Sequence, residues 1–345
     1  MAKGTGFNAV LIGTGMVART HLGALQDAPQ VTLTGVAARH EDSARAFAEA
    51  ADMPLHVYPD IASIAADDAV DIAVIATPPN ARLDIVEPLA RAGKHILLEK
   101  PVGRTAEEAE AVVKVCEEAG VALGIFFQHR MRAASLKAAE LVATGDLGAL
   151  GLVEITVPWW REQGYYDEPG RGTYARDGGG VMISQAIHTI DLALSLAGPV
   201  SQVQAMTATT RFHDMESEDF ATAGLKFANG AVGSMVASTA SYPGTAETIA
   251  LHYERASLTL NSGTLAVRWR DGREETFGAT GGTGGGADPM AFTHEWHQSI
   301  VEDFADALVQ GRPPAASGRA ALPAHRLIDA IARSAAEGHI TEVPQ

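Results

Sequence analysis

The sequence contains very little cysteine and few aromatic residues. Among its 345 residues there is one cysteine, Cys116, and phenylalanine, tryptophan and tyrosine together make up 6% of the chain. A single thiol excludes an internal disulfide and therefore a small disulfide-stabilised scaffold. Cys116 lies in the amphipathic pattern AEEAEAVVKVCEEAG, so we expect a buried helical position rather than a reactive thiol.

Positive charge and long apolar runs are also scarce. The chain has 26 lysines and arginines against 42 aspartates and glutamates, a formal net charge of -16, and no basic run. This balance argues against nucleic acid and anionic membranes as partners. No apolar stretch reaches the roughly 18 residues that a membrane helix needs, and the opening MAKGTGFNAVLIG has no signal-peptide cleavage pattern. We therefore expect a cytoplasmic protein.

The length and the 46% hydrophobic content suit two domains. Residues 1–127 alternate short apolar runs with amphipathic helical stretches. Each predicted strand is followed by a predicted helix. This alternation predicts an α/β domain with a doubly wound parallel sheet.

A glycine-rich turn follows the first predicted strand, residues 7–12, and leads directly into a helix. It reads Gly13-Thr14-Gly15-Met16-Val17-Ala18. The first glycine permits a tight turn, the second lets the backbone approach a pyrophosphate, and the small Ala18 lets helix and strand pack closely. The turn therefore predicts dinucleotide binding through Gly13, Gly15, Met16 and Val17.

The end of the second predicted strand, residues 31–37, indicates which dinucleotide is bound. Ala38 stands about 20 residues after Ala18, where a binder of the unphosphorylated cofactor carries an acid, and Arg39 follows it. A guanidinium there suits a 2′-phosphate, so we favour NADP over NAD. The alternative is that Arg39 only caps a surface turn and Asp42 reaches the ribose.

Two further strand ends carry polar groups. Thr77-Pro78-Pro79-Asn80 ends one strand, and HILLEKPV ends another with Glu99, Lys100 and a proline that could form a cis bond. Open α/β sheets bind ligands at the carboxyl ends of their strands, so we assign these residues to the cofactor site and regard Lys100 also as a candidate reactive group. The alternative is an ordinary solvated strand end. The cofactor set is Gly13, Gly15, Met16, Val17, Ala38, Arg39, Thr77, Pro78, Asn80, Glu99 and Lys100.

The pattern changes after Gln128. Several later stretches alternate apolar and polar residues with period two, which predicts a large open, mostly antiparallel sheet in an α+β domain spanning residues 128–345. Helices are expected near 294–310 and 319–337 and could pack back on the first domain, and the glycine-rich tract 278–289 is expected to form a mobile flap. Some strands are apolar on both faces, so we expect a homodimer or homotetramer formed through the open sheet face.

A second group of polar residues lies in DGGGVMISQAIHTIDLALSLAG, residues 177–198. Three glycines precede a helix on which Ser184, His188 and Asp191 fall near one face. Imidazole moves protons near neutral pH, so His188 is a candidate general base that Asp191 could orient. The alternative is a structural histidine. The pair His294 and His297 lacks a third ligand with matching spacing, so we expect no metal and a surface or interface role for both.

These motifs together resemble the Gfo/Idh/MocA family of oxidoreductases, which includes glucose-fructose oxidoreductase and inositol dehydrogenase. The resemblance rests on GTGMVA, EKP, the GGG-x7-H-x2-D pattern and the C-terminal region from Phe304 to Ile340, and it covers nearly the whole chain. It implies a Rossmann domain that binds NAD(P), an open-sheet domain that binds the substrate and mediates dimers or tetramers, and catalytic roles for Lys100 and His188. It also implies a sugar, a sugar derivative or a cyclitol as substrate.

One position departs from the family pattern: Ser184 stands where many members have aspartate. Serine can hydrogen-bond a hydroxyl group but cannot act as a carboxylate, so the departure affects the substrate rather than catalysis. The segment PWWREQGYYDEPGRGTYARDGGG resembles the substrate-wall loop of the sugar-processing branch, although it could also be a domain-interface loop. The predicted substrate set is Lys100, Gln128, Arg130, Arg161, Tyr166, Tyr174, Asp177, Ser184 and His188.

Two other functions are compatible with the architecture. A dihydrodiol- or biliverdin-type reductase would act on a C–C or C=C bond. A catalytically silent NADP-binding sensor would need neither Lys100 nor His188, so the presence of both residues favours an enzyme.

Overall fold

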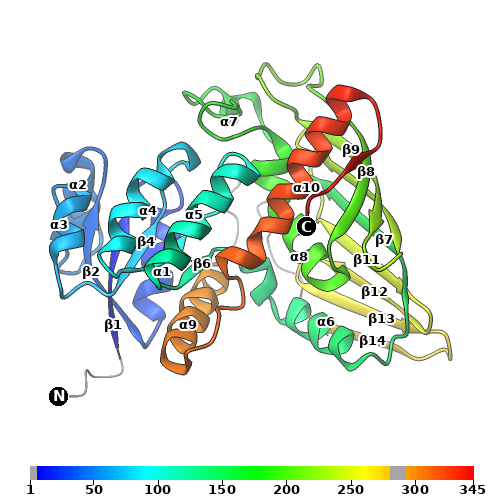
Figure 1. Ribbon diagram of the computed structural model, residues 1–345, viewed down its shortest axis with the longest axis horizontal. Helices are drawn as coiled ribbons and strands as arrows, with labels where there is room; N and C mark the ends of the chain where they lie inside the picture. The colour runs from blue at the N-terminus through cyan, green and yellow to red at the C-terminus, as the bar shows by residue number, and fades with distance from the viewer. Residues whose placement is uncertain (1–5, 280–292) are drawn as a thin grey trace. The chain divides into compact units, whose positions relative to one another are not determined.

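The computed structural model describes residues 6–279 and 293–345 (Figure 1). These residues form two compact units. The first comprises residues up to Gly103, Glu107–Gln128 and Thr293–Ala321, and the second comprises Arg104–Ala106, residues 129–279 and Leu322–Gln345. Most of the glycine-rich tract 278–289, which we expected to be a flap, lies outside the described residues.

The first unit contains a six-stranded sheet in the order β3-β2-β1-β4-β5-β6. All of its strand pairs are parallel, and β4 is buried along its whole length, as expected for a sheet covered on both faces. The predicted doubly wound sheet is therefore confirmed. Its strands are β1 (Phe7–Ile12), β2 (Val31–Ala37), β3 (His56–Val57), β4 (Ile72–Ile75), β5 (His95–Leu98) and β6 (Leu123–Ile125).

Helices connect these parallel strands. Because the strand order reverses at β1 and such crossovers are right-handed, α1 and α2 cover one face of the sheet and α4 and α5 the other. Cys116 is buried on α5 as predicted, and burial raises the pKa of its thiol to about 12. The helices of this unit are α1 (Ala18–Asp27), α2 (Glu41–Ala50), α3 (Ile61–Ala66), the short 3-10 turn η1 (Pro79–Ala81), α4 (Arg82–Arg91), α5 (Ala106–Ala119) and α9 (Glu295–Gln310), which packs on α1.

The second unit contains a nine-stranded sheet in the order β14-β13-β12-β11-β7-β10-β9-β8-β15. Its neighbouring strands are antiparallel except β7 and β10, which are parallel. We predicted a large open, mostly antiparallel sheet, and this prediction is confirmed. The exception arises because β10 returns from β9 and pairs with a strand far earlier in the chain. The strands are β7 (Leu150–Pro158), β8 (Val200–Ala208), β9 (Phe220–Phe227), β10 (Val232–Ser238), β11 (Thr248–Tyr253), β12 (Ala256–Asn261), β13 (Thr264–Trp269), β14 (Glu274–Gly278) and β15 (Thr341–Glu342).

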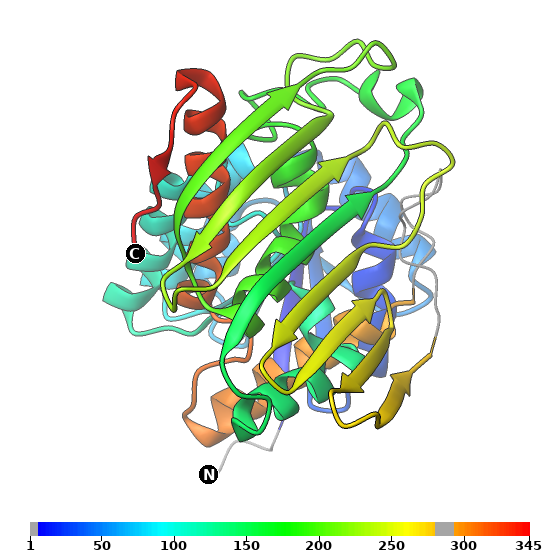
Figure 2. The same cartoon turned by 90° about the vertical axis from the view of Figure 1, so that its right-hand side faces the viewer.

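One face of this sheet packs against helices and the other is open. Helix α8 contacts β7 and β11, and α6 contacts β12, β13 and β14. Figure 2 shows the opposite face, over which none of the described helices lies. Exposed apolar side chains on the strands include Leu152, Met206, Val232 and Val236. The remaining helical elements are η2 (Gln128–Met131), α6 (Ala133–Thr144), α7 (Gln163–Tyr166), the π-helical turn η3 (Met182–Ala186), α8 (Ile187–Ala197) and α10 (Gly318–Glu337).

No described helix combines the length and the apolar character needed to cross a membrane.

Candidate active site

The predicted cofactor residues of the first unit follow four neighbouring strands. Gly13 comes directly after β1, Ala38 after β2, Thr77 soon after β4 and Lys100 soon after β5. Since the sheet order is β2-β1-β4-β5 and the strands are parallel, all four lie along the carboxyl edge of the sheet. The fold thus places residues that are distant in sequence along the edge where such sheets bind ligands.

The glycine turn has the geometry that a dinucleotide requires. Gly13 has φ 108°, and a Cβ built there would lie 2.7 Å from the Ala76 carbonyl oxygen, so a side chain cannot be accommodated. A Cβ at Gly15 would meet no described atom within 4 Å, which leaves open space beside the turn. The first turn of α1 carries no acidic residue, and no described side chain caps it. A helix N-terminus of this kind suits a pyrophosphate, so the residues fit a dinucleotide.

The neighbouring strand ends leave several predicted residues accessible. Arg39, Pro78 and Asn80 are exposed, and Met16 is exposed beside the glycine turn. The strand end at Ala38 carries no carboxylate, while Asp42 lies exposed in the first turn of α2. The exposed guanidinium of Arg39 is therefore accessible to an anionic group.

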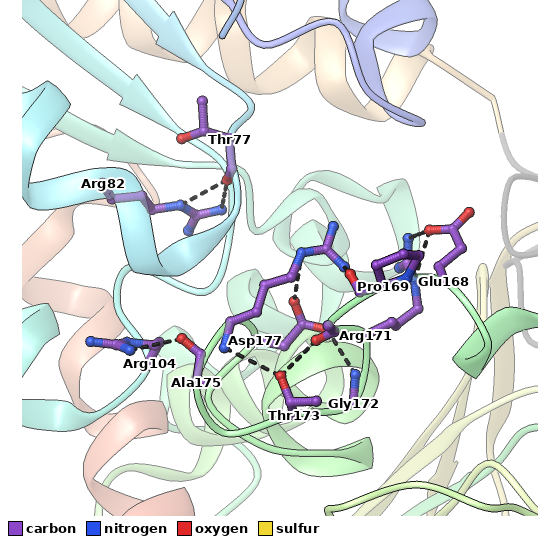
Figure 3. A network of polar contacts seen from close by, with 12 residues as sticks. Thr77, Arg82, Arg104, Glu168, Pro169, Arg171, Gly172, Thr173, Ala175 and Asp177 are labelled. Carbon is purple, nitrogen blue, oxygen red and sulfur yellow. Dashed lines mark hydrogen bonds and ion pairs between the residues drawn. The ribbon is translucent and has the colours of Figure 1, made fainter.

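Lys100 follows β5 in a turn whose backbone is held by Arg82. The buried Arg82 guanidinium donates to the Thr77 carbonyl from two nitrogens, at 3.2 and 3.0 Å (Figure 3), and to the Lys100 carbonyl at 3.2 Å. It also donates to the Glu99 carbonyl. The Lys100–Pro101 peptide is cis, as we suggested from the sequence. One buried cation therefore ties together the ends of β4 and β5.

Glu99 is buried, and its side chain contacts two histidines. Its Oε1 lies 3.0 Å from His21 Nε2 and 3.7 Å from His297 Nε2. The Glu99 carboxylate, which we predicted for the cofactor site, therefore binds within the first unit. The surface or interface role expected for His297 is wrong, because this side chain is buried within the first unit, whereas His294 is partly exposed and pairs with Asp27 at 2.7 Å.

In the second unit, two consecutive residues of η2 contact the helix that carries His188. The ring of His129 stacks on that of His188, with centroids 4.8 Å apart and an interplanar angle of 24°. Arg130 donates to both Asp191 carboxylate oxygens at 2.6 Å. We expected Asp191 to orient His188, but its carboxylate binds Arg130. Burial lowers the pKa of the Arg130 guanidinium, but the Asp191 charge and hydrogen bonds outweigh burial and raise it.

The helix differs from our expectation in two respects. Ser184 lies in the π-helical turn η3, so the α-helical spacing that relates it to His188 does not apply to the whole segment. In α8 nearly every residue is buried, so there is no separate polar face. The buried polar side chains of this helix therefore need hydrogen-bond partners within the second unit.

The loop before this helix contains four of the predicted substrate residues. Tyr166 is buried, and its hydroxyl lies 2.6 Å from Thr239 Oγ1. Arg161 is also buried, with its guanidinium 5.6 Å from the ring of Tyr165. Both side chains therefore make structural contacts within the second unit. Tyr174 is exposed, and Asp177 accepts a hydrogen bond from the Gly172 amide at 3.0 Å (Figure 3). Gln128, the first residue of η2, is buried.

Glu218 was not predicted from the sequence, although its carboxylate binds the backbone at the three-glycine segment. Its buried carboxylate accepts hydrogen bonds from the Gly180 and Met182 amides, both at 3.1 Å. A Cβ at Gly180 would lie 1.8 Å from the Glu218 carbonyl oxygen, so only glycine fits there. No local signal could identify this residue, because it approaches from the segment before β9. Among the described residues, no group of three or more His, Cys, Asp or Glu side chains could hold a metal ion.

Comparisons with known proteins support this interpretation of the site. Residues 7–127 match the family described as "Oxidoreductase family, NAD-binding Rossmann fold", and residues 135–259 match the "GFO/IDH/MocA C-terminal domain". The chain is 29% identical over 311 residues to D-xylose 1-dehydrogenase (NADP(+)) 2 of Haloferax volcanii, covering 89% of this chain and 91% of that protein. It is 27% identical to inositol 2-dehydrogenase of Rhizobium meliloti, covering 95% and 96%.

A solved structure is also similar along the whole chain. Levoglucosan dehydrogenase in complex with NADH and levoglucosan superposes with a TM-score of 0.87 at 25% identity, covering 99% of this chain and 100% of that one. Both units thus have counterparts in sugar and cyclitol dehydrogenases.

Proposed function

Since the chain belongs to the Gfo/Idh/MocA family of oxidoreductases, we propose that it transfers a hydride between a nicotinamide cofactor and a secondary hydroxyl group of a sugar, a sugar derivative or a cyclitol. The observation that carries the proposal is the position of Lys100, which follows β5 on the same sheet edge as the glycine turn after β1. Relatives named for xylose, inositol and levoglucosan support the substrate class.

In this proposal Lys100 and His188 divide the polar chemistry between them. A nicotinamide cofactor held by the glycine turn of the first unit would supply the acceptor for the hydride of the substrate carbon. His188 takes the hydroxyl proton as general base, because imidazole exchanges protons near neutral pH. The Lys100 ammonium stabilises the developing alkoxide, and in the reverse direction it polarises the ketone.

Within the first unit the residues that hold the cofactor would be Gly13, Gly15, Met16 and Val17 at the pyrophosphate, with Thr77, Pro78 and Asn80 near the next strand end. We propose NADP as the favoured cofactor. The exposed Arg39 and the lack of a carboxylate at Ala38 support this choice, because a guanidinium binds a phosphate better than a neutral ribose.

We also propose that the protein forms a homodimer or a homotetramer through the open face of the nine-stranded sheet. The exposed Leu152, Met206, Val232 and Val236 support this, since a monomer would leave these apolar side chains in water. The substrate contacts are proposed to come from the exposed or half-buried residues of the predicted set, which are Lys100, Arg130, Tyr174, Asp177 and Ser184.

The mechanism is tested by Lys100→Met and His188→Asn. Each variant should lower kcat by about a hundredfold or more while cofactor binding, measured by fluorescence titration, stays within about twofold. Lys114→Met, an exposed lysine on α5, is the matched control and should keep full activity. The substrate panel should contain polyols and aromatic dihydrodiols. Turnover of the dihydrodiols alone would contradict the proposed substrate class, and near-normal turnover by His188→Asn from about pH 6 to about pH 9 would contradict the assignment of the base.

A further inference from the structure

The carboxylate of Glu99 lies in a buried cluster directly before Lys100 in the chain. Its side chain is 9% exposed and lies against His21, whose side chain is fully buried, and His297, whose side chain is 1% exposed. The two Nε2 atoms face the same oxygen, Oε1, at 3.0 and 3.7 Å. Burying a charged carboxylate beside two imidazoles costs desolvation free energy. The cluster stands next to the proposed catalytic lysine in spite of this cost.

Three distant parts of the first unit supply this cluster. His21 comes from α1, His297 from α9 and Glu99 from the end of β5, and α9 packs on α1. Phe126, just after β6, lies against both imidazoles, with ring centroids 4.4 Å from His21 and 5.5 Å from His297. The rings are therefore held by packing as well as by hydrogen bonds.

The cluster is connected to the backbone of Lys100. The second carboxylate oxygen, Oε2, accepts a hydrogen bond from the Lys100 amide at 3.1 Å. The Lys100 carbonyl accepts one from Arg82 at 3.2 Å, and the Glu99 carbonyl accepts another from the same guanidinium. Both backbone groups of Lys100 thus have buried partners, which limits the directions in which its side chain can leave the backbone.

The charge of Lys100 also interacts with one member of the cluster, His297. Burial raises the pKa of the Glu99 carboxyl, but the hydrogen bonds and charges of His21 and His297 outweigh burial and hold that pKa well below its usual value. Burial lowers the pKa of His297, and the Lys100 charge acts in the same direction. Arg82, the first residue of α4, also reaches this turn, where its guanidinium binds the carbonyl groups of Glu99 and Lys100. Glu99 therefore stays anionic at neutral pH, where a negative charge favours the ammonium form of Lys100.

We propose that Glu99, held by His21 and His297, is the positioning residue for Lys100: it fixes the lysine backbone and keeps the amine protonated. The role of Glu99 in catalysis rests on the proposed function, whereas the effect of Glu99 on the protonation of the Lys100 amine does not. The two can therefore be tested separately.

The first experiment measures the Lys100 amine without any turnover. The full-length protein, without substrate, is labelled with trace acetic anhydride from about pH 6 to about pH 11, and acetylation of Lys100 is followed by peptide mass spectrometry. Glu99→Gln should lower the midpoint of Lys100 labelling by about one pH unit or more, because an opposite charge is lost. Glu302→Gln, the same change at a half-buried position on α9, should leave the midpoint unchanged.

An unchanged midpoint in Glu99→Gln would overturn the inference. If Glu99→Gln does not fold, His21→Phe serves as the second variant, since it keeps a ring against Phe126 but removes the 3.0 Å hydrogen bond to the carboxylate. It should shift the midpoint in the same direction, and no shift would again overturn the inference.

The second experiment uses kinetics. Glu99→Gln should lower kcat by about tenfold or more, move the alkaline limb of the kcat profile to lower pH, and leave the KM for the cofactor within about twofold. An effect confined to KM would contradict a positioning role. Wild-type protein that turns over no substrate of the panel would refute the proposed function, and the labelling result would then decide the inference about Glu99 by itself.

Discussion

Replacing Asp191 with asparagine should destabilise the second unit by about 3 kcal/mol, because it removes one charge of a buried ion pair. The Asp191 side chain is 1% exposed and that of Arg130 is 14% exposed. Both carboxylate oxygens accept hydrogen bonds from Arg130 at 2.6 Å. The pair joins η2 to α8, the helix that carries His188.

The magnitude follows from this geometry. Two unit charges about 4 Å apart at an effective dielectric constant of about 20 attract each other by about 4 kcal/mol. Removing one partner of a buried pair typically costs about 3–5 kcal/mol, since the remaining charge loses its compensation. The partial exposure of Arg130 places this pair at the lower end of that range.

Thermal unfolding followed by circular dichroism measures the effect. For a domain of about 150–250 residues, a loss of about 3 kcal/mol lowers Tm by about 6–12 °C. Arg130→Met should cost a similar amount, and the double variant Arg130→Met/Asp191→Asn should cost clearly less than the sum of the two single changes, because it leaves no unpaired charge. Strictly additive effects, or single changes that cost less than about 1 kcal/mol, would refute the argument.

Three other predictions concern the cofactor, the oligomer and Tyr166. Arg39→Ala should weaken NADP binding while sparing NAD in fluorescence titrations, and equal or better NAD binding by the wild type would show that NADP is not favoured. Val236→Glu, on the open sheet face, should dissociate the oligomer seen by light scattering, and a wild-type protein of 36.1 kDa at micromolar concentration would exclude the proposed assembly. Burial raises the pKa of Tyr166, so its phenol stays protonated and Tyr166→Phe should leave the pH profile unchanged up to about pH 10; loss of the alkaline limb would implicate Tyr166 in proton transfer.

Much of the fold and part of the site were encoded in local sequence. The six parallel strands could be predicted because apolar runs alternate with amphipathic helices, and the glycine turn because Gly13 needs a positive φ. Gly15 and Lys100 were recognisable because each lies two or three residues after a strand that the local pattern reveals. Their position along one sheet edge then follows from the parallel topology.

The partners of the polar side chains were decided only by the tertiary structure. Glu99 meets His21 and His297, and Arg130 meets Asp191, across gaps of 61 to 198 residues in the chain. The same holds for Glu218 and Gly180, and for the parallel pairing of β7 with β10. A buried polar group must find a partner wherever the packed chain supplies one, and this depends on which elements approach each other in space. Local periodicity reports the type of an element and its buried face, but it does not report which distant side chain will satisfy a buried charge.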